Sequence, residues 1–208
     1  MVLNNTITPL IYFFRYLNGD SSTLSMTDTE LWKHIINNDK VAFEELYHRY
    51  YSPLLSYAQR LQFNEEIIKD CIQDLFVKIY INRQNLPVVD SVKPYLYRSL
   101  TNSLLDKVKS IRNNTISIDE LMDISIEDEG VLALFKENDN DLLKAQYLKN
   151  ALNQLSTKQK NALYFRFIKE FTWEEMAEMF QMSEHSCMNL VSRGISNLRA
   201  FWKKLQSD

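Results

Sequence analysis

Glycine and proline are scarce in this chain, which has 3 Gly and 4 Pro among 208 residues. Turns between strands depend heavily on these residues, and no stretch alternates apolar and polar side chains as a half-buried strand does. The only cysteines, Cys71 and Cys187, stand far apart at apolar positions of helical patterns. They indicate buried thiols in a reducing compartment and exclude a disulfide scaffold. The sequence therefore predicts an all-α fold.

Long apolar runs and catalytic patterns are also missing. Residues 9–17 form the longest candidate for a membrane segment, but Arg15 interrupts this run and it is too short to cross a bilayer. No cation precedes it, which argues against a signal peptide and favours a cytoplasmic protein. No Ser/His/Asp set, metal-ligand cluster or glycine-rich phosphate loop appears. We therefore expect no enzyme activity, no catalytic residues, no cofactor and no metal.

Charge is distributed unevenly along the chain, although the formal net charge is only −3. Residues 117–141 hold nine Asp/Glu against one Lys/Arg, whereas residues 142–208 hold ten Lys/Arg against six Asp/Glu. Residues 1–116 are nearly balanced. This pattern predicts two helical bodies joined by an acidic linker. We consider two roles for the linker: a soluble tether, or a competitor for phosphate that suppresses stray DNA binding.

Residues 171–202 have the pattern of a helix-turn-helix. Thr172 and Glu175 form a capping box that opens a first helix over 173–180, in which we expect Met176, Ala177 and Phe180 to be buried. Residues 181–183 make the turn, with Met182 pointing inward and Gln181 where DNA-binding versions usually have glycine. The exposed face of the second helix would meet DNA bases with Glu184, His185, Met188, Asn189, Ser192 and Arg193. A plain helical hairpin has the same apolar period and is the alternative.

Further helices are predicted upstream. A capping box of Thr27 and Glu30 marks where the regular helical pattern begins, after Met26. A long helix follows over about 41–61. The next, capped by Asn64, carries an outward face of Asp70, Gln73, Asp74 and Lys78. Ser156 and Gln159 form a capping box for a helix over 157–169, in which Leu163, Phe165 and Phe167 would point inward.

The helix that begins near Val92 combines cations with aromatic rings. Its outward row is Arg98, Asn102, Asp106 and Lys109. The surrounding cations and aromatics are Lys93, Lys107, Arg112, Tyr95 and Tyr97. A groove for backbone phosphates and stacked bases requires this combination. A solvated helix face without function is the alternative.

The chain resembles the extracytoplasmic-function (ECF) group of bacterial RNA polymerase sigma factors. Four segments carry the resemblance, in the family's order: AFEELYHRYYSPLLSYAQRL, IKDCIQDLFVKIY, VKPYLYRSLTNSLLDKVKS, and the stretch from ALNQLSTKQK through the helix-turn-helix to SNLR. Asp70, Gln73, Asp74 and Phe76 match the pattern of the polymerase-binding helix. Arg98, Asn102 and Asp106 match the row that holds the start-proximal promoter element.

The resemblance implies a domain organisation and partners. It divides the chain into an N-terminal extension (1–25), a domain for the polymerase clamp and the start-proximal element (26–112), an acidic flexible linker (113–142) and an upstream-element domain (143–208). Core RNA polymerase, promoter DNA and an anti-sigma factor are the implied partners. The polymerase-binding residues would be Asp70, Gln73, Asp74 and Phe76. The implied DNA-binding residues are Lys93, Tyr95, Arg98, Asn102, Lys109, Arg112, His185, Met188, Asn189, Ser192 and Arg193. A stand-alone helix-turn-helix repressor or helical adaptor is the alternative, and it would have no need of the Asp70/Gln73/Asp74 face.

Overall fold

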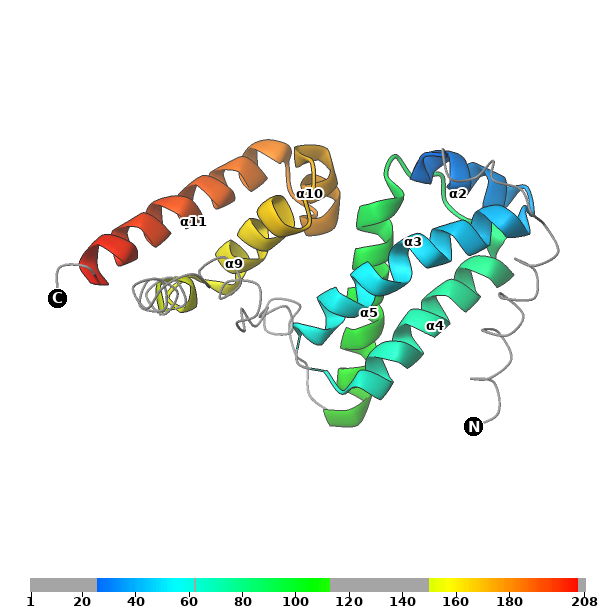
Figure 1. Cartoon of the computed structure of the whole chain (residues 1–208), viewed down its shortest axis with the longest axis horizontal. Coiled ribbons are helices and arrows are strands. Elements are labelled where there is room, and N and C mark those ends of the chain that lie inside the picture. The colour runs from blue at the N-terminus through cyan, green and yellow to red at the C-terminus, as the bar shows by residue number, and fades with distance from the viewer. Residues whose placement is uncertain (1–25, 62, 113–149, 206–208) are drawn as a thin grey trace, which may run out of the picture. The chain divides into compact units, whose positions relative to one another are not determined.

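The computed structural model describes residues 26–61, 63–112 and 150–205, and the regular elements in these ranges are all helical (Figure 1). The all-α prediction is therefore confirmed. The expected N-terminal extension lies outside the described residues, and so does the acidic linker. The described residues belong to two compact units. The first contains residues up to Pro53 together with Phe76–Val92, and the second contains Leu54–Leu75 together with the chain from Lys93 onward.

The first unit holds α2 (Asp28–Ile36), the beginning of α3 (Lys40–Gln59), the end of α4 (Glu65–Ile81) and the short 3-10 helix η2 (Arg83–Asn85). A capping box between Thr27 and Glu30 opens α2, as the sequence predicts. The indole of Trp32, 2% exposed, donates a hydrogen bond to the carbonyl oxygen of Pro87 at 3.0 Å. This bond ties α2 to the loop that follows η2.

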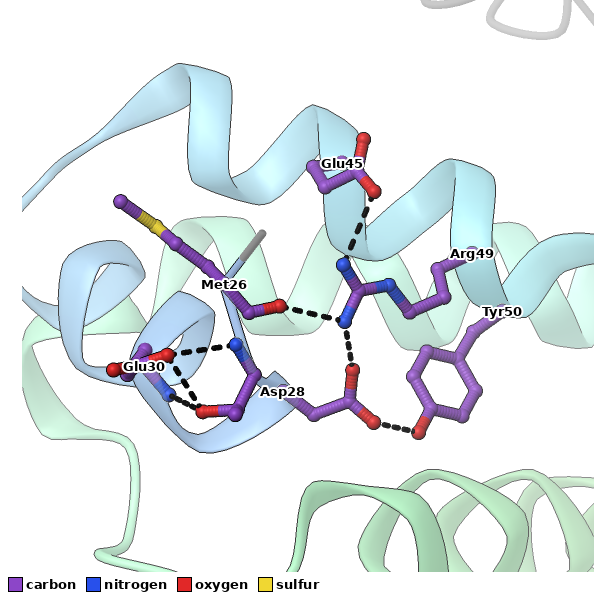
Figure 2. A network of polar contacts seen from close by, with 7 residues as sticks. Met26, Asp28, Glu30, Glu45, Arg49 and Tyr50 are labelled. Carbon is purple, nitrogen blue, oxygen red and sulfur yellow. Dashed lines mark hydrogen bonds and ion pairs between the residues drawn. The ribbon is translucent and has the colours of Figure 1, made fainter. Parts of the chain in front are cut away.

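Arg49 of α3 joins α2 to α3 through a polar network (Figure 2). Its guanidinium donates to the backbone oxygen of Met26 at 3.1 Å, to a carboxylate oxygen of Asp28, and to Glu45 at 3.2 Å. The hydroxyl of Tyr50 donates to the other carboxylate oxygen of Asp28. Because the Arg49 guanidinium bonds three acceptors in a partly buried place, these charge-assisted bonds hold the start of α2 against α3.

Aromatic rings join α3 to the end of α4 in the same unit. The ring of Phe76 lies 4.9 Å from that of Tyr47 and 6.2 Å from that of Phe43, measured between centroids, in edge-to-face arrangements. Phe43 also contacts Tyr80 at 5.1 Å. Aromatic pairs in such geometry contribute about 0.5–1.5 kcal/mol each beyond their area burial.

The second unit contains the rest of α3 and α4, followed by α5 (Val92–Arg112), α9 (Thr157–Leu163), the π-helical turn η3 (Tyr164–Ile168), α10 (Trp173–Phe180) and α11 (Glu184–Leu205). Four aromatic side chains form its centre, each at most 1% exposed: Tyr57, Tyr97, Phe165 and Phe171. Their ring centroids lie 4.9–5.9 Å apart in five contacting pairs.

Two hydroxyl groups are satisfied inside this aromatic centre. The Thr101 hydroxyl donates to the backbone oxygen of Tyr97 at 2.8 Å, so the Tyr57 hydroxyl donates to Thr101 at 3.0 Å. The prediction that Tyr97 belongs to a nucleic-acid groove is therefore wrong. It stands one residue before Arg98, and neighbouring residues of a helix point in directions about 100° apart, so Tyr97 enters the core.

The helix predicted over 157–169 forms in two parts. The Ser156–Gln159 capping box is confirmed and opens α9, and η3 continues the chain as a π turn to Ile168. Phe165 is fully buried, but Phe167 is 57% exposed, so the inward position expected for Phe167 is wrong. Residues two apart lie on opposite sides of a helix, and only one of the two rings can face the core.

Candidate polymerase and nucleic-acid interfaces

The helix-turn-helix is built by local signals at each helix end. The Thr172–Glu175 capping box opens α10, as predicted. At its other end, Gln181 adopts φ 53° and ψ 45°, the left-handed conformation that favours glycine. The Gln181 amide donates to the Glu178 oxygen and the Met182 amide to the Ala177 oxygen. This is a Schellman motif, and it turns the chain sharply toward α11.

The core of the helix-turn-helix differs in part from the prediction. Met176 and Cys187 of α11 are fully buried, as expected. Ala177 and Phe180 were expected to be buried but are half-buried, and Met179 is buried instead. Met182 is 38% exposed, so its predicted inward position is wrong. The left-handed residue before it carries Met182 out of the helical path. Both cysteines are free and buried, which confirms their role as core thiols.

The base-reading face predicted for α11 is open to solvent. Ser183 caps this helix, accepting a bond from the Ser186 amide at 3.2 Å. The side chains expected to meet DNA are exposed, and they are His185, Met188, Asn189, Ser192 and Arg193. Behind them Cys187 and Val191 are buried, at 0% and 4% exposure, which fixes the rotation of the helix. Within the described residues, Asn189 makes no hydrogen bond and Arg193 no ion pair.

The acidic face of α4 is also open. Asp70 and Asp74 are exposed and make no ion pair within the part of the chain that the structure describes, and Gln73 between them is half-buried. Lys69 pairs instead with Glu65 at 2.6 Å, one turn away along the helix. Phe76 is only 2% exposed and packs in the core, so it cannot contribute directly to a docking surface. A residue two positions after Asp74 lies on the opposite side of the helix.

Along α5, the predicted DNA-binding row has a graded exposure. Asn102 and Lys109 are exposed, while Tyr95 and Arg98 are half-buried. Arg98 and Asn102 line a hollow of about 260 Å³. Arg112 is the last residue of α5, and its side chain lies outside the described part. Opposite the row, Leu96, Leu100 and Leu104 are completely buried, as the periodicity predicts.

Lys93 differs from the rest of this row because its ammonium group is already engaged. It donates to the backbone oxygen of Lys169 at 2.7 Å and lies 3.7 Å from a carboxylate oxygen of Glu175. It also lies 4.5 Å from the centroid of the Phe171 ring, in a cation–π contact. In this arrangement Lys93 is not available to phosphate, and sequence reasoning had no local signal for contacts about 80 residues away.

The described residues form neither a metal site nor a membrane span. Across 26–61, 63–112 and 150–205, no group of three or more His, Cys, Asp and Glu side chains comes together in a way that could hold a metal ion. None of the helices in these ranges has the length and hydropathy needed to cross a membrane.

Comparison with known proteins identifies the class. The family model "Sigma-70 region 2" matches residues 46–114, and "Sigma-70, region 4" matches residues 145–198. Together these ranges span more than half of the chain, and they contain α4, α5, α10 and most of α11. The chain belongs to the sigma-70 family, in its ECF group. Sigma factors of this kind bind core RNA polymerase and direct promoter recognition.

Two curated relatives come from Bacillus subtilis (strain 168). The ECF RNA polymerase sigma factor SigM is 19% identical over 172 residues, covering 81% of this chain and 99% of the relative. The RNA polymerase sigma factor YlaC is 25% identical over 146 residues, covering 68% and 81%.

Two solved structures have a similar fold. One is CnrH in complex with the cytosolic domain of CnrY, with a TM-score of 0.55 and 16% identity, covering 85% of this chain and 97% of that one. The other is the sigma factor RpoE in complex with the anti-sigma factor NepR from Bartonella quintana. Its TM-score is 0.50 at 20% identity, covering 77% and 96%.

Proposed function

We propose that this protein is a non-catalytic initiation factor that docks on core RNA polymerase mainly through the exposed face of α4 formed by Asp70, Gln73 and Asp74. The observation that carries the proposal is that both carboxylates are exposed and unpaired within the described residues. Two unpaired acids one helical turn apart present a compact negative surface, which suits a basic docking site on a large partner. Phe76 supports this face indirectly, by anchoring α4 in the core.

The row on α5 is assigned to the start-proximal promoter element. Arg98, Asn102 and Lys109 recur at spacings of four and seven residues and therefore share one helix face. With Tyr95 on the same side, they provide the cations and the aromatic surface that a separated strand needs. Lys93 would have to leave its contacts with Lys169 and Glu175 before it could contribute.

The exposed face of α11 is assigned to the upstream promoter element. This face holds only one permanently charged cation, Arg193. It can therefore neutralise few phosphates, and the affinity of the protein for DNA in the absence of polymerase should be low. Positioning by polymerase would then supply most of the specificity. We assign residues 26–112 and 143–208 to the two domains; the family matches over 46–114 and 145–198 lie mostly within these ranges and support the assignment. The resemblance assigns residues 113–142 to the connector. Work with core polymerase on the chromosome would place the protein in the cytoplasm.

An anti-sigma partner is the expected regulator. Both similar solved structures are complexes with a second protein: CnrH is bound to the cytosolic domain of CnrY, and the sigma factor RpoE is bound to the anti-sigma factor NepR. The same two faces that engage polymerase and DNA are the surfaces that such a partner would need to cover.

Charge reversal on α4 tests the docking proposal. Asp70→Lys with Asp74→Lys places cations against the basic surface and should weaken binding to core polymerase at least about 30-fold, given 2–5 kcal/mol for a buried charge pair. The matched control is Asp70→Glu with Asp74→Glu, which keeps the charge on the same face. Binding would be measured by fluorescence anisotropy and helicity by circular dichroism. Wild-type affinity in the lysine variant would show that α4 is not the docking element.

A further inference from the structure

The base-reading face of α11 has an unusual chemistry for a DNA-binding helix. Counting about 100° per residue, Met188 and Asn189 lie on either side of its centre, between His185 and Ser192. Arg193 lies about 90° from this centre, at the edge that would meet the phosphate backbone. Met188 is 38% exposed, although its neighbours on this face are polar. Midway along the face, the helix therefore offers a thioether on one side of its centre line and an amide on the other, and Arg193, its one permanent cation, lies only at the edge.

These two groups select particular base edges. In the major groove, arginine or lysine is the side chain that pairs with guanine O6 and N7, whereas asparagine pairs with adenine N6 and N7. The thymine methyl is the one apolar group on a base edge, and it calls for an apolar partner. The flexible thioether of methionine adapts well to such a contact. The Asn189 amide is open for pairing because it has no hydrogen bond within the described residues.

We propose that Met188 and Asn189 are the specificity-determining residues of α11, and that they read A·T pairs in the upstream element. Asn189 accepts from adenine N6 and donates to N7, and Met188 covers the C5-methyl group of a thymine in the same or the neighbouring pair. This inference rests on the assignment of α11 to the upstream element. It goes further by naming the base and the atom that each side chain recognises.

Deoxyuridine substitution tests the methionine contact, because it removes only the C5-methyl group of thymine. Core polymerase of the source organism, loaded with the full-length protein, would first select its promoters from genomic fragments. Each thymine of the upstream element would then be replaced in turn. Open-complex formation by the wild type should fall about fourfold at one thymine, the effect of one buried methyl group. The Met188→Ala holoenzyme should be insensitive to the same replacement.

Met182→Ala is the matched control, since Met182 is also 38% exposed but stands in the turn before α11. Its holoenzyme should keep the fourfold response to deoxyuridine. Met188→Leu should keep most of it. For Asn189, replacing one adenine with 7-deaza-adenine should cost the wild type at least about fivefold and Asn189→Ala almost nothing.

Three outcomes would overturn the proposal. Deoxyuridine could leave open-complex formation by the wild type unchanged at every thymine, or it could reduce open-complex formation by Met188→Ala as much as by the wild type. The third outcome is an upstream element that contains no A·T pairs. These outcomes can be told apart from a failure of the proposed function. In that case the wild-type protein would not support initiation on any fragment.

Discussion

Replacing Gln181 with glycine should stabilise the helix-turn-helix. Gln181 holds φ 53° and ψ 45°, and its side chain is exposed. An L-residue pays about 1–2 kcal/mol in this left-handed conformation, because its Cβ atom crowds the following carbonyl oxygen. Glycine avoids that cost but loses about 0.5–1 kcal/mol more entropy on folding. The net gain in the free energy of unfolding should therefore be about 0.5–1 kcal/mol.

The assay is urea unfolding followed by circular dichroism. Gln181→Gly should raise the midpoint without changing the slope, because the surface exposed on unfolding stays the same. Gln181→Val should lower stability by at least about 1 kcal/mol, since a β-branched residue is the least tolerant of positive φ. The control is Ser196→Gly at an exposed position within α11, where glycine should cost about 0.5 kcal/mol. If both glycine variants lose stability equally, Gln181 does not hold the left-handed conformation.

Three further predictions follow from the described contacts. Burial raises the pKa of Tyr164 to about 12. Burial also raises the pKa of Tyr57 and Tyr97, so the unfolded chain ionises first at all three tyrosines. Stability should therefore fall as the pH rises above 10, as pH-dependent urea midpoints would reveal, and Tyr164→Phe should reduce the loss reached at pH 12 by roughly 2–3 kcal/mol. Arg49→Gln strips Asp28 of its charged partner and should cost about 1–3 kcal/mol by the same method, with Arg199→Gln at an exposed position of α11 as the surface control. The full-length protein without polymerase should bind its promoter no better than about micromolar at physiological salt, measured by filter binding, and a tight, sequence-specific complex would favour a repressor.

Local signals explain what the sequence predicts well. All three capping boxes form as expected, because each needs only residues three apart in the chain. The exposed face of α11 follows from helical period alone. The acidic face of α4 follows in the same way, apart from Phe76. The family pattern groups Phe76 with the docking residues, whereas helical period places it on the apolar face, and its aromatic neighbours confirm the core position.

Contacts between distant segments explain what the sequence misses. Tyr97 enters a core that includes rings from α3 and η3, and no local sequence pattern indicates those partners. The engagement of Lys93 depends on the backbone oxygen of Lys169, which has no sequence signature. The left-handed Gln181 is a departure from the usual glycine, and it changes the direction of Met182. Hydrophobic periodicity does not predict a left-handed backbone conformation of this kind.

A run-off transcription assay tests the central claim most directly. Core RNA polymerase from the source organism would be incubated with genomic DNA fragments, with and without this protein. We predict discrete transcripts that appear only when the protein is present, and that disappear in the Asp70→Lys, Asp74→Lys variant but persist in the Asp70→Glu, Asp74→Glu variant. Identical transcripts with and without the wild-type protein, from a core enzyme that responds to another sigma factor in the same reaction, would contradict the account.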